Sequence, residues 1–496
     1  MSTRSEHYDA IVVGSGFGGA TAAYRLSKAG ARTLMIERGG WPSRDDKDWD
    51  ARSILLEHRY KGDSPLEVHL YGGDRPDVYP NEIVGGMSVF YGGASLRLRE
   101  RDFDRWPIDY TDLEPYYLEA ERLLGVHGAD SDPTGPPRSG PFPAPPIPPT
   151  NPAERIQEAA RECGHRPFPI PLAINFSDES RPTCILCTTC DGYPCRIEAK
   201  NDLTRTVLLA AQNAGLEIVA NCIAGRFLRE GDRISGVECC DASTGEQVRY
   251  TADTFVLSAG AIQSPAMLLR SGIDGPVVGR CLMRHCNVII TCVFPFQTNP
   301  EKTFHKQTCI TDLYEQQRSE TGAAVGVIQD IYTPDHQVMK AHAPWWGKLA
   351  IGLTHRYLQN LLCVAEDDAQ EENRVELTAK TDRYGLETPR VTHDYSEADK
   401  ERSRTLAVAA REILEKAGGR MPYRYLIDTF SHAVGSVRMG DDSDESALDT
   451  DCRVRGTGNL YCVDGSFMPT SGGVNPSLTI AANGLRVGEH LAQGAV

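Results

Sequence analysis

The sequence has no apolar run long enough to cross a membrane, which would take about 18 residues with few or no charges. Its first residues, MSTRSEHYDAIVVG, also lack the apolar core of about 7 to 15 residues that a secretory signal contains. We therefore expect no transmembrane segment and a cytoplasmic location. Because the cytoplasm is reducing, the 15 cysteines are not expected to form many structural disulfides.

Positive charge is in deficit. The chain has 52 Lys and Arg against 68 Asp and Glu, which gives a net charge of −16. Nucleic acids and anionic lipid surfaces are bound mainly through Lys and Arg, so we expect no nucleic-acid partner. With 40% hydrophobic residues in 496, the composition is that of a globular protein of two or three domains, at roughly 150 residues per domain.

The first 40 residues carry a strand, turn, helix and strand pattern. Apolar residues 10–13 predict a buried strand, residues 20–29 a helix and residues 33–37 a second strand. The turn between the first strand and the helix has the form Gly-x-Gly-x-x-Gly, with Gly14, Gly16 and Gly19. This spacing is typical of a site that binds a dinucleotide.

Each glycine of that turn has a physical role. The first permits the tight turn, the second lets the backbone approach a pyrophosphate, and the third lets the helix pack on the strand. The helix N-terminus adds partial positive charge. Glu37, at the end of the second strand, can accept hydrogen bonds from ribose hydroxyls. FAD and NAD both fit this pattern, and its position near the start of a long chain favours FAD.

A second glycine cluster surrounds an aromatic pair, Phe90 and Tyr91. Paired glycines allow backbone N–H groups to lie against a flat ring or a phosphate, although a turn packed in the core would look the same. Farther along, small residues at Ala259 and Gly260 separate an apolar strand from a helix, a geometry suited to close contact with a cofactor.

Three further motifs lie near the C-terminus: His432 in SHAVGS, Asp464-Gly465 after a strand, and Asn475-Pro476 before a final helix. With these motifs in this order, the chain resembles the glucose-methanol-choline (GMC) family of FAD-dependent oxidoreductases from about residue 8 to about residue 492. Its Gly-Gly-Met-Ser segment is most similar to that of pyranose oxidase-like, sugar-oxidising members.

The resemblance implies an α/β fold, in which a discontinuous Rossmann-like FAD-binding domain is joined to an α+β substrate domain with an antiparallel sheet. The FAD-binding domain would comprise residues 1–130, 198–290 and 425–496. The substrate-binding or lid domain would comprise residues 131–197 and 291–424.

The resemblance also implies the chemistry. An alcohol CH–OH group would lose hydride to flavin N5, with His432 as the base, a task that suits imidazole near neutral pH. Asn475 matches the partner that holds the substrate oxygen, although Asn before a helix can also be an N-cap. In related members a histidine at the position of Phe90 can bind the flavin covalently, so FAD is expected to be held without a covalent bond.

The expected cofactor contacts are Gly14, Gly16, Phe17, Gly19, Glu37, Arg38, Gly85, Gly86, Ser88, Gly92, Gly93, Ala259, Gly260, Asp464, Gly465, Asn475 and Pro476. The favoured substrate is a sugar, glycoside or polyol, with oxygen or a redox partner as the electron acceptor. A sterol or other lipophilic alcohol is an alternative substrate. Further alternatives are a non-redox lyase of the same family and a binding protein that keeps the flavoprotein fold.

Four cysteines form a dense C-x2-C-x2-C-x4-C run: Cys184, Cys187, Cys190 and Cys195. A structural role, as free thiols or a local disulfide, is favoured over an iron-sulfur cluster or a zinc site. Some family dehydrogenases carry a cluster in this region, which would give the run a redox role.

Other predictions concern local structure. Residues 216–261 predict a β-meander, residues 373–396 a hairpin, and Ser396 with Asp399 a capping box. The aromatic stretch 344–362 is predicted to be a core helix beneath the substrate sheet. His285, His355 and His393 have no supporting motif and are assigned no role.

Overall fold

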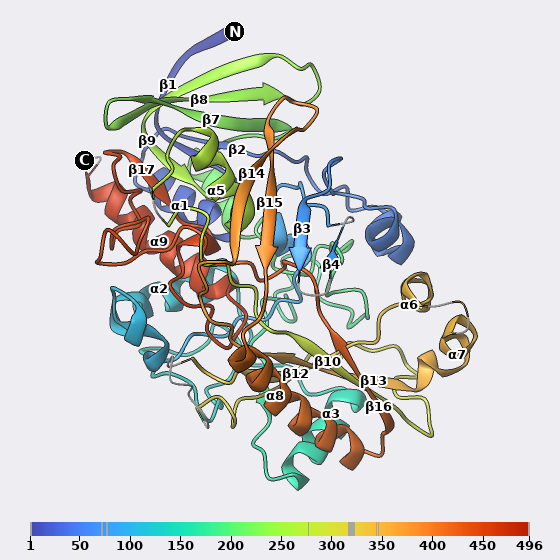
Figure 1. Cartoon of the computed structure of the whole chain (residues 1–496). Coiled ribbons are helices and arrows are strands. Elements are labelled where there is room, and N and C mark those ends of the chain that lie inside the picture. Colours follow the sequence, from blue (N-terminus) through green and yellow to red (C-terminus); the bar gives the residue numbers. More distant parts are fainter. Residues whose placement is uncertain are drawn as a thin grey trace.

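The computed structural model describes residues 2–70, 73–75, 78–275, 277–315, 323–343, 345 and 347–494. Within these residues the strands form three sheets. The first sheet lies at the end of the molecule that carries both chain termini, and the second lies at the opposite end (Figure 1). The residues that connect them form the walls of the functional site.

The first sheet has the order β6-β2-β1-β9-β8-β7, with β17 also paired to β9. β6, β2, β1, β9 and β17 are parallel, whereas β7, β8 and β9 form the predicted antiparallel meander. The strand bounds are β1 Ser2–Val13, β2 Thr33–Ile36, β6 Glu217–Val219, β7 Cys222–Glu230, β8 Arg233–Asp241, β9 Gln247–Leu257 and β17 Leu460–Cys462. The predicted strand, helix and strand at the start of the chain are confirmed.

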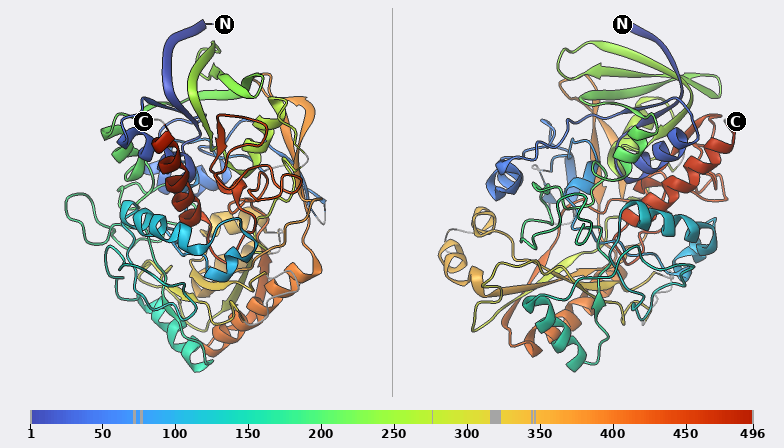
Figure 2. Two further views of the ribbon diagram at one scale, coloured as in Figure 1. Left: turned by 90° about the vertical axis from the view of Figure 1, so that its left-hand side faces the viewer. Right: turned by 180° about the vertical axis from the view of Figure 1, so that it is seen from behind.

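Helices pack against this sheet. α1 (Phe17–Lys28) lies beside α9 (Ser477–Gly494), so the first and last helices of the chain are neighbours (Figure 2). A Cβ on Gly484 would lie 2.2 Å from the Thr21 hydroxyl oxygen, so this close approach requires glycine. The other helices of this part are α2 Tyr110–Leu123, α4 Val207–Asn213 and α5 Gly260–Arg270.

The second sheet is antiparallel, with the order β16-β10-β13-β12-β11-β5. α8 and α3 cover its outer face (Figure 1). α8 begins with the predicted capping box between Ser396 and Asp399. The bounds are β5 Phe168–Pro169, β10 Val288–Val293, β11 Thr308–Ile310, β12 Val327–Ile331, β13 Leu358–Val364, β16 Arg420–Leu426, α3 Asn151–Glu162 and α8 Glu397–Lys416.

A smaller sheet, β14-β15-β3-β4, lies between the other two (Figure 1). Its predicted hairpin, β14 (Arg374–Thr381) and β15 (Glu387–His393), pairs in parallel with β3 (Glu67–Leu70), which in turn pairs with β4 (Gly73–Asp74). This sheet therefore combines strands from both expected domains, and the division into domains stays a prediction. Short helical turns are η1 Asp46–Trp49, η2 Arg52–Leu56, η3 Gly86–Val89, η4 Glu100–Arg105, η5 His355–Tyr357 and η6 Gly465–Phe467.

The prediction of a core helix over residues 344–362 was wrong. Helix α7 (Gly347–Thr354) lies on the surface beside α6 (His336–His342), and its Leu349 and Leu353 side chains are 75% and 70% exposed. The buried part of the stretch is strand β13, which lies between β10 and β12. The apolar residues thus belong to two different elements. Of the two tryptophans, Trp345 is exposed and Trp346 lies outside the described residues.

None of the helices in the described part of the chain is both long and apolar enough to span a bilayer.

Candidate active site

A cavity of about 1790 Å³ lies between the first and second sheets. On one side it is lined by residues at the carboxyl ends of β1, β2 and β9, the edge at which parallel sheets bind ligands. On the other side it is lined by residues of β12, β13 and β16. The cavity therefore brings the glycine turn near the N-terminus together with His432 and Asn475 from near the C-terminus.

The three glycines of the turn meet different surroundings. Gly14 has φ +98°, and a Cβ there would lie 2.2 Å from the Ser258 carbonyl oxygen. A Cβ on Gly19 would lie 2.2 Å from the Gly14 carbonyl oxygen, and the Gly19 N–H donates to Ser258 Oγ at 2.7 Å. A Cβ on Gly16 would meet nothing within 4 Å, and Gly16 lines the cavity. The protein's own packing thus requires Gly14 and Gly19, whereas Gly16 leaves space for a ligand.

The N-terminus of α1 opens on the same cavity. No side chain caps this 12-residue helix, and its first turn holds no acidic residue. The first backbone N–H groups of a helix need acceptors, and the helix dipole favours an anion there. Phe17 and Gly18 of that turn line the cavity. The open space at Gly16 and the uncapped helix together fit the pyrophosphate of a dinucleotide.

Glu37 holds the glycine turn from the neighbouring strand. Its carboxylate accepts hydrogen bonds from the Ser15 N–H at 3.0 Å, the Ser15 hydroxyl at 2.6 Å and the Gly39 N–H at 2.9 Å. Burial raises the pKa of Glu37. The adjacent Arg38 lines the cavity and forms ion pairs with Glu82 and Asp382. Both residues line the cavity next to the glycine turn.

The second glycine cluster packs directly on the first. Gly85 and Gly86 have φ +92° and +53°, and the Gly85 N–H donates to Ser15 Oγ at 2.9 Å. A Cβ on Gly86 would lie 3.2 Å from the Gly16 Cα. Ser88 donates to the Gly85 carbonyl at 2.6 Å, so it closes this turn. The expected contacts Gly86 and Gly92 line the cavity together with Phe90 and Tyr91, whereas the expected contacts Gly19, Gly85, Ser88 and Gly93 lie behind its wall.

Asp464 fixes two segments of the cavity wall relative to each other. One carboxylate oxygen accepts from the Gly260 N–H at 3.0 Å and from the Ser264 hydroxyl, and the other from the N–H and hydroxyl of Ser466. Both oxygens therefore have protein donors. Ala259, Gly260, Gly465 and Pro476, all expected cofactor contacts, line the cavity with Asp464.

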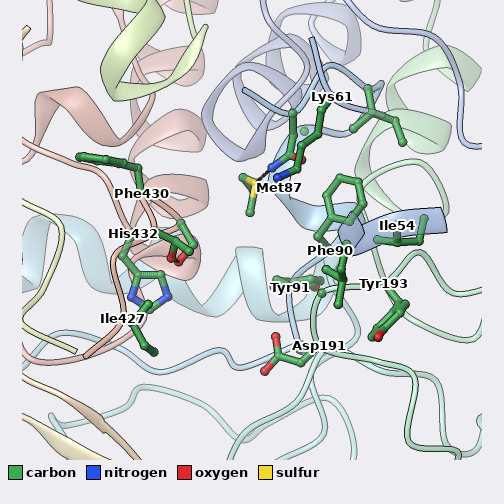
Figure 3. Close-up of a pocket in the computed structure, with 18 of the residues that line it drawn as sticks. Ile54, Lys61, Met87, Phe90, Tyr91, Asp191, Tyr193, Ile427, Phe430 and His432 are labelled. Carbon is green, nitrogen blue, oxygen red and sulfur yellow. Dashed lines mark hydrogen bonds between the residues drawn. The ribbon is translucent and has the colours of Figure 1, made fainter. Parts of the chain in front are cut away.

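His432 faces the cavity opposite Tyr91 and Asp191 (Figure 3). Its Nδ1 lies 2.9 Å from His285 Nδ1, and its Nε2 lies 3.4 Å from Asn475 Nδ2. The Asn475 oxygen accepts from Gln329 Nε2 at 2.7 Å, so this amide is turned toward His432 and Gln329 and does not cap α9. The two residues predicted to be catalytic are thus adjacent.

Sequence reasoning missed two residues of this group. His285 was assigned no role, yet its ring is perpendicular to that of His432, with the ring centres 5.1 Å apart. Gln329 lies in the middle of β12 and is fully buried. No local motif marks either residue, because both reach His432 and Asn475 from segments that are distant in the sequence. The polar pair Gln329 and Asp330 between the apolar residues of β12 was the one available signal.

The cysteine run forms part of the opposite wall. All four thiols are free, and no group of three potential metal ligands was found among the described residues. Burial raises the pKa of Cys184 to about 12 and that of Cys190 to about 11, so both thiols stay protonated near neutral pH. The structural role of the cysteine run stays a prediction.

The same run brings Asp191 and Tyr193 to the cavity (Figure 3). Buried Lys200 fastens the run to the second glycine cluster, because its three ammonium N–H groups are shared among four carbonyl oxygens, those of Val89, Tyr91, Cys190 and Tyr193, at 2.7 to 3.0 Å. Asp191 forms an ion pair with buried Lys306. The run therefore shapes the wall opposite His432.

If His432 acts as the base, we expect the rate of flavin reduction to stay constant as the pH falls through 6.5. Burial, together with the charge of the nearby Lys306, holds the pKa of His432 well below its ordinary value, and Asp367 opposes this only in part. A base must be neutral to accept a proton, so activity should decline only at pH values below 6.5. Stopped-flow rates of flavin reduction between about pH 4.5 and 8 would measure this limb. A midpoint at or above 6.5 would contradict the expectation.

Comparison with known proteins identifies relatives along nearly the whole chain. Models of the GMC oxidoreductase family match residues 8–287 and 369–484. The 6'''-hydroxyparomomycin C oxidase of Streptomyces lividus is 31% identical over 99% of this chain and 92% of its own length. The paromamine 6'-oxidase of Streptomyces fradiae is 30% identical over 98% of this chain and 91% of its own length.

Solved structures share the fold. A formate oxidase variant from Aspergillus oryzae RIB40 superposes with a TM-score of 0.73 at 15% identity, covering 99% of both chains. The pyridoxine 4-oxidase from Mesorbium loti does so with a TM-score of 0.64 at 20% identity, covering 98% of both. These comparisons confirm the expected fold class and the resemblance drawn from the sequence motifs.

Proposed function

Because the chain belongs to the GMC oxidoreductase family, an enzyme family acting on CH–OH groups, we propose that it is an FAD-dependent enzyme that oxidises the alcohol group of a sugar, glycoside or polyol. The observation that carries this proposal is the position of His432 and Asn475 in the same cavity as the glycine turn. A dinucleotide at the turn and a hydroxyl group at the His432–Asn475 pair would share this one cavity.

The residues of the cavity fit FAD. The pyrophosphate would be held by the backbone at Gly16 and the N-terminus of α1, and the ribose by Glu37. When bound, FAD supplies the acceptor for the hydride that leaves the alcohol carbon. Phe90 stands where related members can carry a flavin-linked histidine, and its side chain has no nucleophile. FAD is therefore held without a covalent bond in this proposal.

The chain's own residues handle the proton. His432 Nε2 takes the proton of the substrate hydroxyl as hydride leaves the carbon, and the imidazole becomes an imidazolium. The Asn475 Nδ2 donor, 3.4 Å from His432 Nε2, can hydrogen-bond the substrate oxygen as negative charge develops on it. The hydride thus leaves from the carbon, and the proton leaves from the oxygen of the same C–O bond.

Two lines of support favour a sugar-type substrate. The relatives that are about 30% identical over nearly their whole length are named as oxidases of aminoglycosides, which are sugars. The cavity also combines aromatic faces at Phe90, Tyr91 and Tyr332 with the charged pair Asp191 and Lys306, a combination that suits a ring bearing several hydroxyl or amino groups.

Anaerobic bleaching of bound flavin tests the function. The purified protein should be yellow, and a panel of sugars, glycosides, polyols and aminoglycosides should contain alcohols that bleach it. A colourless protein that takes up no added FAD would contradict the redox proposal. A yellow protein that bleaches with sterols or long-chain alcohols, but with no sugar, would show that the substrate is a lipophilic alcohol. One that no alcohol bleaches would favour the lyase alternative.

Replacing Gln329 with leucine should lower the rate of flavin reduction about fivefold, because the Asn475 oxygen would lose a hydrogen bond worth about 1 kcal/mol that orients the amide. The matched test is a double-mutant cycle with Asn475→Ala. If Gln329 acts through Asn475, the Gln329→Leu substitution should have almost no further effect in the Asn475→Ala background. Fully additive losses would show that Gln329 acts elsewhere.

A further inference from the structure

We propose that His285 is a positioning residue that holds His432 in the one neutral tautomer able to accept a proton from substrate. The proposal rests on the proposed function, because it concerns the same base. Its evidence is a chain of three contacts that runs from two backbone carbonyls through His285 to His432.

The chain starts at carbonyl oxygens, which can only accept hydrogen bonds. His285 Nε2 lies 2.8 Å from the Gly472 carbonyl oxygen and 3.2 Å from that of Ser471. Nε2 must therefore carry a proton. Because His285 is buried, which lowers its pKa, the ring is neutral near pH 7 and its Nδ1 has a free lone pair.

This lone pair determines the state of His432. The two Nδ1 atoms are 2.9 Å apart, and since His285 Nδ1 is an acceptor, His432 Nδ1 must be the donor. A neutral His432 with its proton on Nδ1 has its lone pair on Nε2. That atom faces Asn475 Nδ2 at 3.4 Å. The lone pair of His432 Nε2 thus points to the place beside Asn475 where the substrate hydroxyl would lie.

The surroundings of His285 hold it in an unfavourable backbone conformation. Its φ is +62°, a left-handed value that is rare for a residue with a side chain. Its N–H donates to Asp367 Oδ1 at 3.0 Å, and its carbonyl accepts from the Tyr395 hydroxyl at 2.7 Å. Ser471 also donates to Asp367 Oδ1, at 2.8 Å, which ties the carbonyl segment to the same carboxylate. Strained backbone that is held by several contacts is typical of functional sites.

The contact between His285 and His432 also acts after proton transfer. When Nε2 has taken the substrate proton, the His432 imidazolium keeps its Nδ1–H bond to His285, so the ring does not rotate. The charged and titratable groups around the two rings are Asp367, Lys306, Arg284, His393 and Tyr395. Asp367 is the anion among them, and its pKa is held at about 2, so it stays ionised throughout the working range.

The test is ¹⁵N NMR of the holoenzyme with its histidines labelled at both ring nitrogens, with His432→Ala used for assignment. At a pH above the acid limb, His432 should show a protonated Nδ1 and an unprotonated Nε2. In His285→Asn, His432 should become a mixture of the two tautomers. Asparagine tolerates left-handed backbone, so this variant is expected to fold. His393→Asn is the matched control, because His393 contacts Asp367 without touching His432, and it should leave the tautomer unchanged.

Kinetics supply the second readout. In His285→Asn we expect flavin reduction to slow about tenfold to a hundredfold, with an unchanged FAD content and Tm. The acid limb should move downward, because the His432 imidazolium would lose the acceptor of its Nδ1–H bond. A wild-type His432 that carries its proton on Nε2 would overturn the proposal, as would an unchanged tautomer and pH profile in His285→Asn. If His285→Asn does not fold, the wild-type spectrum alone still decides. A wild-type holoenzyme that no alcohol bleaches would instead refute the proposed function, whatever the tautomer.

Discussion

Replacing His432 with alanine is expected to slow anaerobic bleaching of the bound flavin by about two to four orders of magnitude, the usual contribution of a positioned acid–base group. The imidazole Nε2 is adjacent to Asn475 in the cavity, and no other histidine of the described residues approaches that amide in the same way. Without the imidazole, the hydroxyl proton would have to pass to water. The measurement is a single-turnover rate in a stopped-flow instrument, with a substrate that the alcohol panel identifies.

The matched control is His490→Ala. His490 lies on α9, the helix that follows Asn475, but its side chain is on the surface near Asp451. This variant should bleach at the wild-type rate. If His432→Ala bleaches within a factor of about three of wild type, His432 is not the base. Because the flavin absorbs before substrate is added, the FAD content of each variant is measured in the same sample.

Replacing Gly16 with valine should strongly weaken FAD binding while leaving the fold intact. A Cβ at this position meets nothing within 4 Å, and the backbone φ of −69° suits any residue. The valine side chain would occupy the space at the N-terminus of α1 that the pyrophosphate needs. We expect the affinity for FAD to fall by about a hundredfold or more, equivalent to about 2.7 kcal/mol. Flavin fluorescence titration of the apoprotein measures the affinity, and circular dichroism checks the fold.

Two other glycines serve as comparisons. Gly14→Ala should destabilise the protein itself by about 3 kcal/mol or more, because the residue has φ +98° and its Cβ would overlap the Ser258 carbonyl oxygen. Gly494→Val, at the exposed end of α9, should change neither affinity nor fold. If Gly16→Val binds FAD as tightly as wild type, the pyrophosphate does not lie at this turn. Unfolding of Gly16→Val would show that the space is needed by the protein.

Much of the fold was predictable because its signals are local. The alternation of strand, glycine turn and helix around Gly14 depends on residues that are neighbours in the chain, and so does the capping box at Ser396. The stretch 344–362 was mispredicted because periodicity reports only that a segment is apolar. Burial of β13 depends on its two partner strands, which the segment itself does not encode.

The sequence by itself determined the ingredients of the site: a glycine turn with an acidic residue after it, a histidine, and an asparagine before the last helix. These residue types have chemical roles that do not depend on distant parts of the chain. Only the tertiary structure decided which groups act on them. His285 and Gln329 gain their roles from contacts across 147 and 146 residues, and the cysteine run becomes a cavity wall through Lys200. Hydrogen bonds orient a ring or an amide only over about 3 Å, so these roles arise when packing brings distant segments together.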